Sequence, residues 1–95
     1  PIPDQYALHQ NYPNPFNPVT TIEYDLPENV RVSLSVYDVL GREITHLVNA
    51  DEVAGYHQVQ WNGTDAQGRN VSSGMYFIRL VAGKYHSVKK MVLLK

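Results

Sequence analysis

The side chains able to do chemistry in this 95-residue chain are scattered rather than grouped. The histidines lack the spacing of metal ligands and fall in separate predicted strands and loops, at His9, His46, His57 and His86. There is no cysteine, and Ser72-Ser73-Gly74 lacks the flanking pattern of a nucleophile elbow. No carboxylate pair stands out as a glycosidase acid and nucleophile, and no glycine-rich loop precedes a helix. We therefore predict no catalytic residue, no cofactor, and a role other than that of an enzyme.

One oxygen-rich segment, residues 61–68, has two interpretations. Asn62, Thr64 and Asp65 lie close enough in sequence to bind calcium. Such side chains also bond their own backbone in turns, and the two glycines of the segment can supply positive φ. The turn is favoured, so we predict no metal site, and calcium binding stays as the alternative.

The aromatic side chains raise the question of sugar binding. Seven of them are tyrosines, and a platform for sugar rings could be built from Tyr12, Tyr56, Tyr76 and Tyr85. Tyrosines are equally normal in half-buried strands. The aromatic content therefore leaves a carbohydrate-binding module open without favouring it.

Charge is distributed unevenly along the chain, although the net charge is only −1. All nine carboxylates lie at or before Asp65, whereas residues 66–95 carry six Lys and Arg side chains and no acid. Either the two halves interleave and neutralise each other, or a basic C-terminal strand meets an acidic partner. The chain has no nucleic-acid recognition motif, so we expect no nucleic acid among its partners.

A two-residue hydrophobic period predicts strands along most of the chain. Alternation is clear over 22–26, 30–37 and 56–61, and further strands are predicted at 6–8, 43–48, 75–82 and 85–94. Segment 75–82 is apolar on both faces, which predicts a central strand, and 51–55 is predicted as a loop. His57 falls on the buried face and is interpreted as a hydrogen-bonded structural histidine. Turn signals about every 8–12 residues complete the pattern of an all-β fold, an immunoglobulin-like antiparallel β-sandwich of about seven strands.

Residues 11–18, with the sequence NYPNPFNP, form a proline run that cannot be a helix or a central strand. Its three prolines fix φ and remove backbone donors. Tyr12 and Phe16 give the run two large side chains, and we predict that both are buried against the sandwich. We place a linker and a short lead-in strand at 1–10 and the sandwich at 11–95. The chain starts at Pro1 rather than Met, which suggests a fragment of a longer precursor, and no stretch reaches the roughly 20 apolar residues of a membrane span.

Ordered motifs from residue 8 to residue 95 resemble the type A C-terminal sorting domain of the type IX secretion system. The middle part, from Trp61 to Tyr76, is also similar to the immunoglobulin-like domain of flagellar hook-capping proteins. The proline run and the lysine-ended tail set the sorting family apart. The motifs are Leu8-x-Gln10-Asn11-Tyr12-Pro13-Asn14-Pro15-Phe16-Asn17-Pro18, Thr21-Ile22-x-Tyr24-x-Leu26-Pro27, Val36-Tyr37-Asp38-x-Leu40-Gly41-Arg42-Glu43, Leu47-Val48, Ala54-Gly55-x-His57, Trp61-Asn62-Gly63-x-Asp65-x-x-Gly68, Ser73-Gly74-x-Tyr76-Phe77 and Lys90-Met91-Val92-Leu93-Leu94-Lys95.

The resemblance implies a signal that delivers an N-terminal cargo domain of the same precursor. Such a precursor crosses the periplasm and is recognised by an outer-membrane translocon and its shuttle proteins. A sortase-like surface protease then removes the domain, so that the cargo is released or anchored at the cell surface. The alternative is an accessory β-sandwich of a secreted enzyme, either a fibronectin-like spacer or a carbohydrate-binding module.

The resemblance also assigns roles to particular residues. Translocon recognition is expected at the glycine-tyrosine motif and the terminal strand, at Gly74, Tyr76, Lys89, Lys90, Val92 and Lys95. An open edge of that strand could be read by strand addition, with the lysines steering an acidic receptor. A structural role is expected for Asn11, Pro13, Pro15, Phe16, Pro18, Trp61, Gly63 and Gly68.

Overall fold

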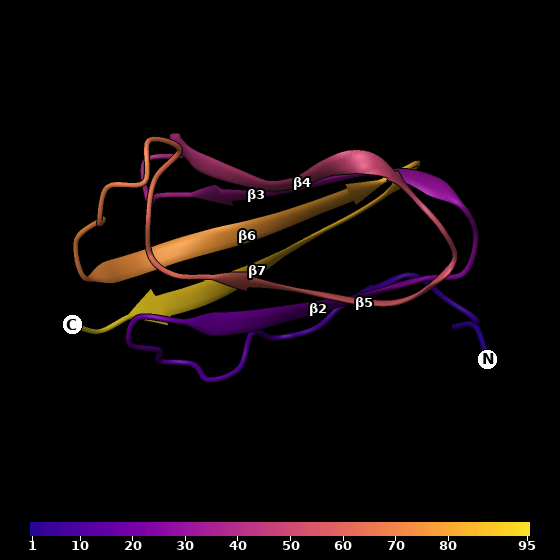
Figure 1. Ribbon diagram of the computed structural model, residues 1–95, viewed down its shortest axis with the longest axis horizontal. Helices are drawn as coiled ribbons and strands as arrows, with labels where there is room; N and C mark the ends of the chain where they lie inside the picture. Colours follow the sequence, from indigo (N-terminus) through magenta and orange to yellow (C-terminus); the bar gives the residue numbers. More distant parts are fainter.

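The computed structural model describes every residue from Pro1 to Lys95 and contains seven strands and no helix. They form two layers, a sheet in the order β1-β2-β5 and a sheet in the order β4-β3-β6-β7, with only antiparallel pairings (Figure 1). The predicted all-β sandwich is confirmed, and no helix is present that is long and apolar enough to cross a membrane. The strands are β1 (Ala7–Leu8), β2 (Thr20–Leu26), β3 (Val30–Tyr37), β4 (Glu43–Glu52), β5 (Gly55–Trp61), β6 (Gly74–Ala82) and β7 (Tyr85–Leu93).

The core fills the space between the inward faces of the two sheets. Because successive side chains of a strand point to opposite faces, every second residue of a half-buried strand enters the core. β6 lies between β3 and β7, which confirms its predicted central position. The buried alternate residues of β2, β3 and β6 are Ile22, Tyr24, Leu26, Val32, Leu34, Val36, Tyr76, Ile78, Leu80 and Ala82.

β4 is longer than the sequence predicts. The expected strand ended at residue 48, whereas β4 continues to Glu52, and only Val53 and Ala54 separate it from β5. The predicted loop over 51–55 is therefore wrong at Asp51, Glu52 and Gly55. Irregularities in the pairing of β3 with β4 break the two-residue period that the prediction relied on.

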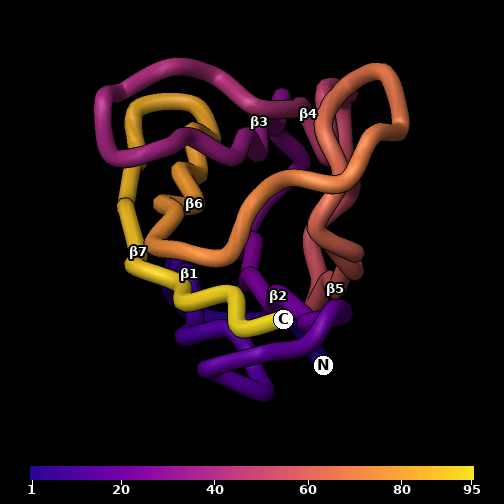
Figure 2. Tube along the Cα trace, turned by 90° about the vertical axis from the view of Figure 1, so that its left-hand side faces the viewer, coloured from indigo at the N-terminus to yellow at the C-terminus, as the bar shows by residue number.

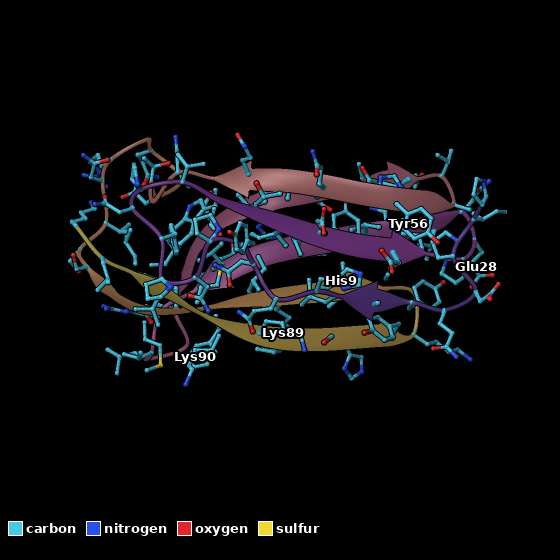
Figure 3. All side chains as sticks on the ribbon, turned by 90° about the horizontal axis from the view of Figure 1, so that it is seen from below. His9, Glu28, Tyr56, Lys89 and Lys90 are labelled. Atoms are coloured by element: carbon cyan, nitrogen blue, oxygen red, sulfur yellow. The ribbon has the colours of Figure 1, made fainter.

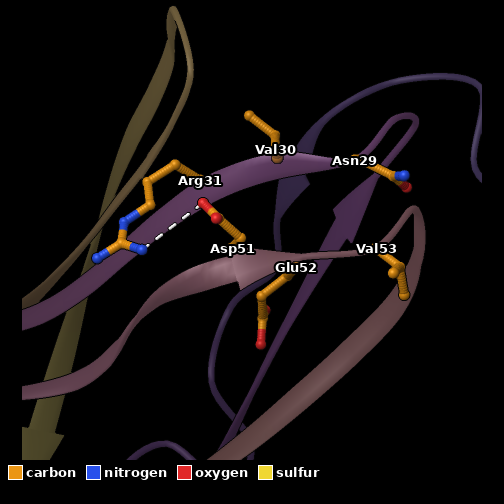
Figure 4. Close-up of a pocket in the computed structure, with 6 residues that line it drawn as sticks. All are labelled: Asn29, Val30, Arg31, Asp51, Glu52 and Val53. Atoms are coloured by element: carbon orange, nitrogen blue, oxygen red, sulfur yellow. Dashed lines mark ion pairs between the residues drawn. The ribbon is translucent and has the colours of Figure 1, made fainter.

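Contacts with the start of β3 hold this extension of β4 in place. Asp51 lies opposite Arg31, and its Oδ1 is 3.6 Å from Arg31 Nη1 (Figure 4). The amide of Ala54 donates a 2.9 Å hydrogen bond to Asn29 Oδ1, which fixes the short connection to β5. Both carboxylates at the end of β4 thus belong to a strand rather than to a loop.

His57 has the structural role predicted for it. Its Nε2 lies 2.8 Å from the carbonyl oxygen of Val53, and its ring stacks on that of Tyr24 with centroids 5.3 Å apart. The Tyr24 hydroxyl donates to the Glu52 carboxylate, and burial raises the pKa of Tyr24 above its usual value. These contacts join β2 and β5 to the end of β4 in the other sheet.

The loops of the sandwich divide between two ends of a molecule 37 Å long. The N-terminus lies at one end, with the short turns that follow β2, β4 and β6 (Figure 1). The C-terminus lies at the other end, where Figure 2 shows the chain before β2, the loop after β3 and the loop after β5 gathered around it. We call this end the C-terminal pole, made of the proline run (Asn11–Pro18), loops 38–42 and 62–73, and the tail from Lys90 to Lys95.

Candidate functional site

The proline run is anchored to the sandwich by the side chain of Asn11, which is almost completely buried. Its Nδ2 donates to Thr20 Oγ1 at 2.9 Å and to the Pro13 carbonyl at 3.2 Å. The Thr20 hydroxyl donates to the same carbonyl at 2.8 Å, and Gln10 Nε2 donates to Asn11 Oδ1 at 2.7 Å. Because prolines cannot donate, these side chains supply the hydrogen bonds that the backbone of the run cannot make.

Of the two aromatic residues of the run, one is buried and the other is exposed. Phe16 is 2% exposed and joins the core, as predicted. Tyr12 is 80% exposed, so the prediction that it is buried is wrong. Tyr12 pairs with Thr21 through two backbone hydrogen bonds, and Thr21 lies between the inward-facing residues Thr20 and Ile22. Opposite residues in such a pair point to the same face, which directs Tyr12 outward.

The proline run also covers the end of β7. Phe16 donates its amide to the Val92 carbonyl and accepts from the amide of Leu94, both at 2.9 Å. The amide of Val92 donates to Asn14 Oδ1 at 2.9 Å, and Gln10 Nε2 donates to the Lys90 carbonyl at 2.7 Å. The edge of β7 that was expected to be open is therefore paired from the Lys90 carbonyl onward.

The first part of the same edge makes no backbone hydrogen bond, although β1 lies beside β7 and Tyr6 stacks on Tyr85 with ring centroids 5.2 Å apart. Backbone groups of a strand point to its two sides at alternating residues, so His86 and Val88 face the same edge as Lys90 and Val92. Neither residue has a backbone hydrogen bond on that side. The open edge is thus a short stretch, from His86 to the amide of Lys90, immediately before the covered one.

An aromatic chain connects the proline run to β6. The rings of Phe16 and Trp61 lie 5.6 Å apart, and those of Trp61 and Tyr76 lie 5.3 Å apart in an edge-to-face arrangement. Trp61 Nε1 donates to the Thr64 carbonyl at 2.9 Å. A Cβ at Gly63 would lie 3.4 Å from the Leu93 side chain, and its φ is +73°, so Gly63 allows this loop to approach the tail closely.

The glycine-tyrosine motif has one exposed and one buried member. Gly74 is exposed and opens β6 opposite Leu93. Tyr76 is only 5% exposed, and its hydroxyl donates to the Ser72 carbonyl at 2.6 Å. Tyr76 therefore bonds loop 62–73 and presents almost no surface to a partner.

The terminal lysines have different surroundings. Lys90 is exposed and Lys89 is half-buried, and neither forms an ion pair (Figure 3). Lys95 is held more closely, because its ammonium group donates to the Val71 carbonyl and its backbone amide donates to Ser73 Oγ at 3.0 Å. No lysine pairs with a carboxylate, so direct ion pairs do not neutralise the basic tail. The side chain of Val92 is half-buried on the outer face of the sheet, opposite Met75.

Two loops at this pole have the same sequence pattern and the same hydrogen bonds. In each, an Asp-x-x-Gly-Arg segment closes on its own aspartate, which accepts backbone amides two and four residues later at 2.9 and 3.0 Å. The glycines have φ of +81° and +80°. The arginine Nε lies 2.8 Å from the carboxylate in the first loop and 3.5 Å in the second. The two segments are Asp38–Arg42 and Asp65–Arg69.

The carboxylates of these twin loops have lowered pKa values. For Asp38, partial burial pushes the pKa upward, but hydrogen bonds from Arg42 and Leu40 outweigh it. For Asp65, the backbone amide of Arg69 is the largest cause of the lowering. Since the Asp65 oxygens are taken up by the turn, the structure supports the turn interpretation of residues 61–68. The sequence prediction missed the repeat, which comparing spaced five-residue patterns along the chain would have found.

Exposed apolar side chains lie beside the first twin loop. Val39 and Leu40 project from its turn, and with Met75 they line a hollow next to Gly74. Apolar residues exposed this close together are typical of contact surfaces. The pole therefore combines an apolar hollow with the unpaired Lys90, and the short open stretch of the β7 edge leads up to it.

Comparisons with known proteins agree with this picture of a small module. A model of the secretion system C-terminal sorting domain matches residues 10–94. Among solved structures, dimeric latent PorU from Porphyromonas gingivalis is 20% identical, with a TM-score of 0.75 over 97% of this chain and 9% of that chain. PorZ, described as an essential bacterial surface component of the type-IX secretion system of the same species, is 23% identical, with a TM-score of 0.63 over 97% of this chain and 12% of that chain.

The chain is also similar in structure to a protein from another organism. FlgD from P. aeruginosa is 20% identical, with a TM-score of 0.61 over 78% of this chain and 58% of that chain. A comparison with curated protein sequences found no match. At these identities the solved structures establish a shared fold, and the chain spans only about a tenth of the two P. gingivalis proteins.

Proposed function

Because the chain belongs to the secretion system C-terminal sorting domain family, we propose that it serves as the recognition signal of a larger exported precursor. Sorting signals of this family direct secretion, so the chain acts as a substrate of the secretion machinery rather than as a catalyst. The type IX system is the proposed machinery, because the motifs resemble its type A signals and PorZ shares the fold. The final destination is the cell surface or the medium, after transit through the periplasm.

One observation carries the assignment of the recognition surface. The family motifs that are far apart in sequence converge at the C-terminal pole, and the open stretch of β7, from His86 to the amide of Lys90, leads up to this pole beside the unpaired Lys89 and Lys90. Strand addition at such an edge gives affinity through backbone hydrogen bonds, and lysines steer an acidic receptor. We assign contact roles to Gly74, Lys89, Lys90 and Val92, and positioning roles to Tyr76 and Lys95, whose polar groups bond loop 62–73.

Cleavage is proposed before the sandwich begins. Pro1, Ile2, Asp4 and Gln5 are exposed and belong to no strand, and a protease needs accessible backbone. The linker at 1–10 and the domain boundary at residue 11 remain predictions. The outer-membrane translocon, its shuttle proteins and a sortase-like surface protease are the proposed partners, and the cargo is released or anchored after cleavage.

A fusion experiment tests the proposed function. Residues 1–95 are placed behind a fluorescent protein that carries a periplasmic signal peptide, in hosts with and without a working type IX system. Protease-accessible fluorescence at the cell surface is expected only in the competent host. Fluorescence retained in the periplasm of both hosts, or delivered to the surface of both, would contradict the proposal. As a control, the same fluorescent protein is fused to a stable fibronectin-like sandwich of similar size. This fusion tests whether any β-sandwich, rather than this one, causes delivery.

A further inference from the structure

The outer face of the three-stranded sheet has a chemistry that export does not require. On β2 the buried residues are Thr20, Ile22, Tyr24 and Leu26, so the residues between them face solvent. On β5 the exposed residues are Tyr56, Gln58 and Gln60. The strands β1, β2 and β5 contain no lysine or arginine. This face is thus polar and free of strong cations.

A hollow lies on this face next to an exposed aromatic ring. It is lined by His9, Glu23, Asp25, Tyr56, His57 and Gln58. The pairing of β2 with β5 places Glu23 opposite Gln58 and Asp25 opposite Tyr56, and His9 Nε2 lies 2.9 Å from Asp25 Oδ2. Figure 3 shows Tyr56 and His9 on this side of the molecule. Tyr56 is 66% exposed, although a tyrosine in a strand ordinarily packs against its neighbours.

We propose that this hollow binds a neutral oligosaccharide. The flat apolar face of the Tyr56 ring suits the C–H face of a sugar ring, and its hydroxyl makes no hydrogen bond within the chain. The carboxylates of Glu23 and Asp25 accept hydrogen bonds from sugar hydroxyls, whereas the Gln58 amide both donates and accepts. The histidine contact holds one oxygen of Asp25 and leaves the other free for a ligand.

Charge and spacing narrow the class of ligand. The two carboxylates and the lack of lysine and arginine disfavour phosphates, nucleic acids and anionic polysaccharides. Tyr12 lies on the same face, beside Thr21 on the far side of β2 from β5, and is also exposed. Strand geometry puts the two tyrosines about 16 Å apart diagonally, four residues along and two strands across. A chain of several sugar rings could therefore contact both.

The test is a titration of the ¹⁵N-labelled 95-residue chain with neutral hexasaccharides. The probes are the hexaoses of the cello, xylo, manno and N-acetylated chito series at millimolar concentration, with an oligogalacturonate as the anionic comparison. Amide shifts centred on β2 and β5, and extending to His9 and Tyr12 beside them, are expected with at least one neutral probe. No shift with any of the four, shifts confined to the other sheet, or tighter binding of the anionic probe would overturn the proposal.

Variants of Tyr56 test whether stacking of a sugar on this ring, rather than a general property of the protein surface, causes the binding. Tyr56→Ala should weaken binding about tenfold, the scale of one lost aromatic contact, and Tyr56→Phe should keep most of the affinity. Val88→Ala, on the outer face of the other sheet, is the matched control and should bind as the parent chain does. Equal affinity of Tyr56→Ala and the parent would refute the site. The secretion assay measures delivery in a competent host, so its result is independent of this one.

Discussion

The two parts of the outer edge of β7 have the same backbone geometry but different surroundings. From the Lys90 carbonyl to the amide of Leu94 the edge is bonded to the proline run and to Gln10, whereas from His86 to the amide of Lys90 it is unpaired. An exposed edge invites pairing with any other chain, which natural proteins limit by covering it or by placing lysines on it. β7 has both kinds of protection on adjacent parts of one edge. The proline run covers one part, and Lys89 and Lys90 lie beside the open part. The covered part therefore serves the fold, and the open part is the one that we propose for recognition.

Removing the anchor of the covered part should have the largest effect. Phe16→Ala deletes a ring that is 2% exposed and contacts Trp61, so the free energy of unfolding should fall by about 3–5 kcal/mol. Urea unfolding followed by tryptophan fluorescence measures the change. Tyr12→Ala in the same run is the matched control, because this exposed ring should change stability by no more than about 0.5 kcal/mol. Equal losses in the two variants would mean that the run does not divide into a buried and an exposed side.

Reversing a charge beside the open part should impair delivery without affecting the fold. Lys90→Glu removes an unpaired cation, and surface delivery of the fluorescent fusion should fall about tenfold through charge repulsion with an acidic receptor. The urea midpoint should stay unchanged, because Lys90 is exposed. Arg31→Glu makes the same charge change on β3, two strands away from β7, and should deliver normally. If both variants lose delivery equally, net charge rather than the edge governs recognition.

A smaller change should loosen the covered part alone. Asn14→Ala removes the acceptor of the Val92 amide, which should cost about 1 kcal/mol and speed hydrogen exchange at that amide. Exchange at Val88, which faces the same edge without a partner, should be fast in both proteins. Slow exchange at Val88 in the parent chain would show that the open part is covered after all.

The twin loops at the C-terminal pole should give the smallest effect, visible as a dependence of stability on pH. The folded-state pKa values of Asp38 and Asp65 are lowered, so the stability they contribute is present above the ordinary carboxyl pKa of about 3.9 and is lost as pH falls through the folded values. Asp38→Asn and Asp65→Asn should each reduce the fall in the urea midpoint below about pH 4. A parent profile that is flat through this range would contradict the assigned hydrogen bonds.

The predicted strands succeeded where the decisive information is local. A strand with one face on the core repeats every two residues, and this period located the buried residues of β2, β3 and β6. The prediction failed at β4, where register shifts against β3 interrupt the period and the partner strand decides where pairing stops.

The candidate site shows the same division between local and long-range information. The motifs that resemble the sorting family can be read directly from the sequence, and so can the basic C-terminal third. The sequence could not show that Asn14 bonds Val92 or that Gln10 bonds Lys90, because these partners are 78 and 80 residues apart. For the same reason the open edge was predicted along the whole of the last strand, whereas the proline run covers its end.

The sequence by itself determined the class of fold, the position of most strands and the resemblance to a sorting signal, because all three depend on residue types at short fixed spacings. Only the tertiary structure decided which part of β7 remains open, and that Phe16 is buried while Tyr12 is exposed. It also placed both Asp-x-x-Gly-Arg loops at one pole. The physical reason is that each of these outcomes depends on which sheet face or strand edge a segment meets, and pairing between distant parts of the chain settles that.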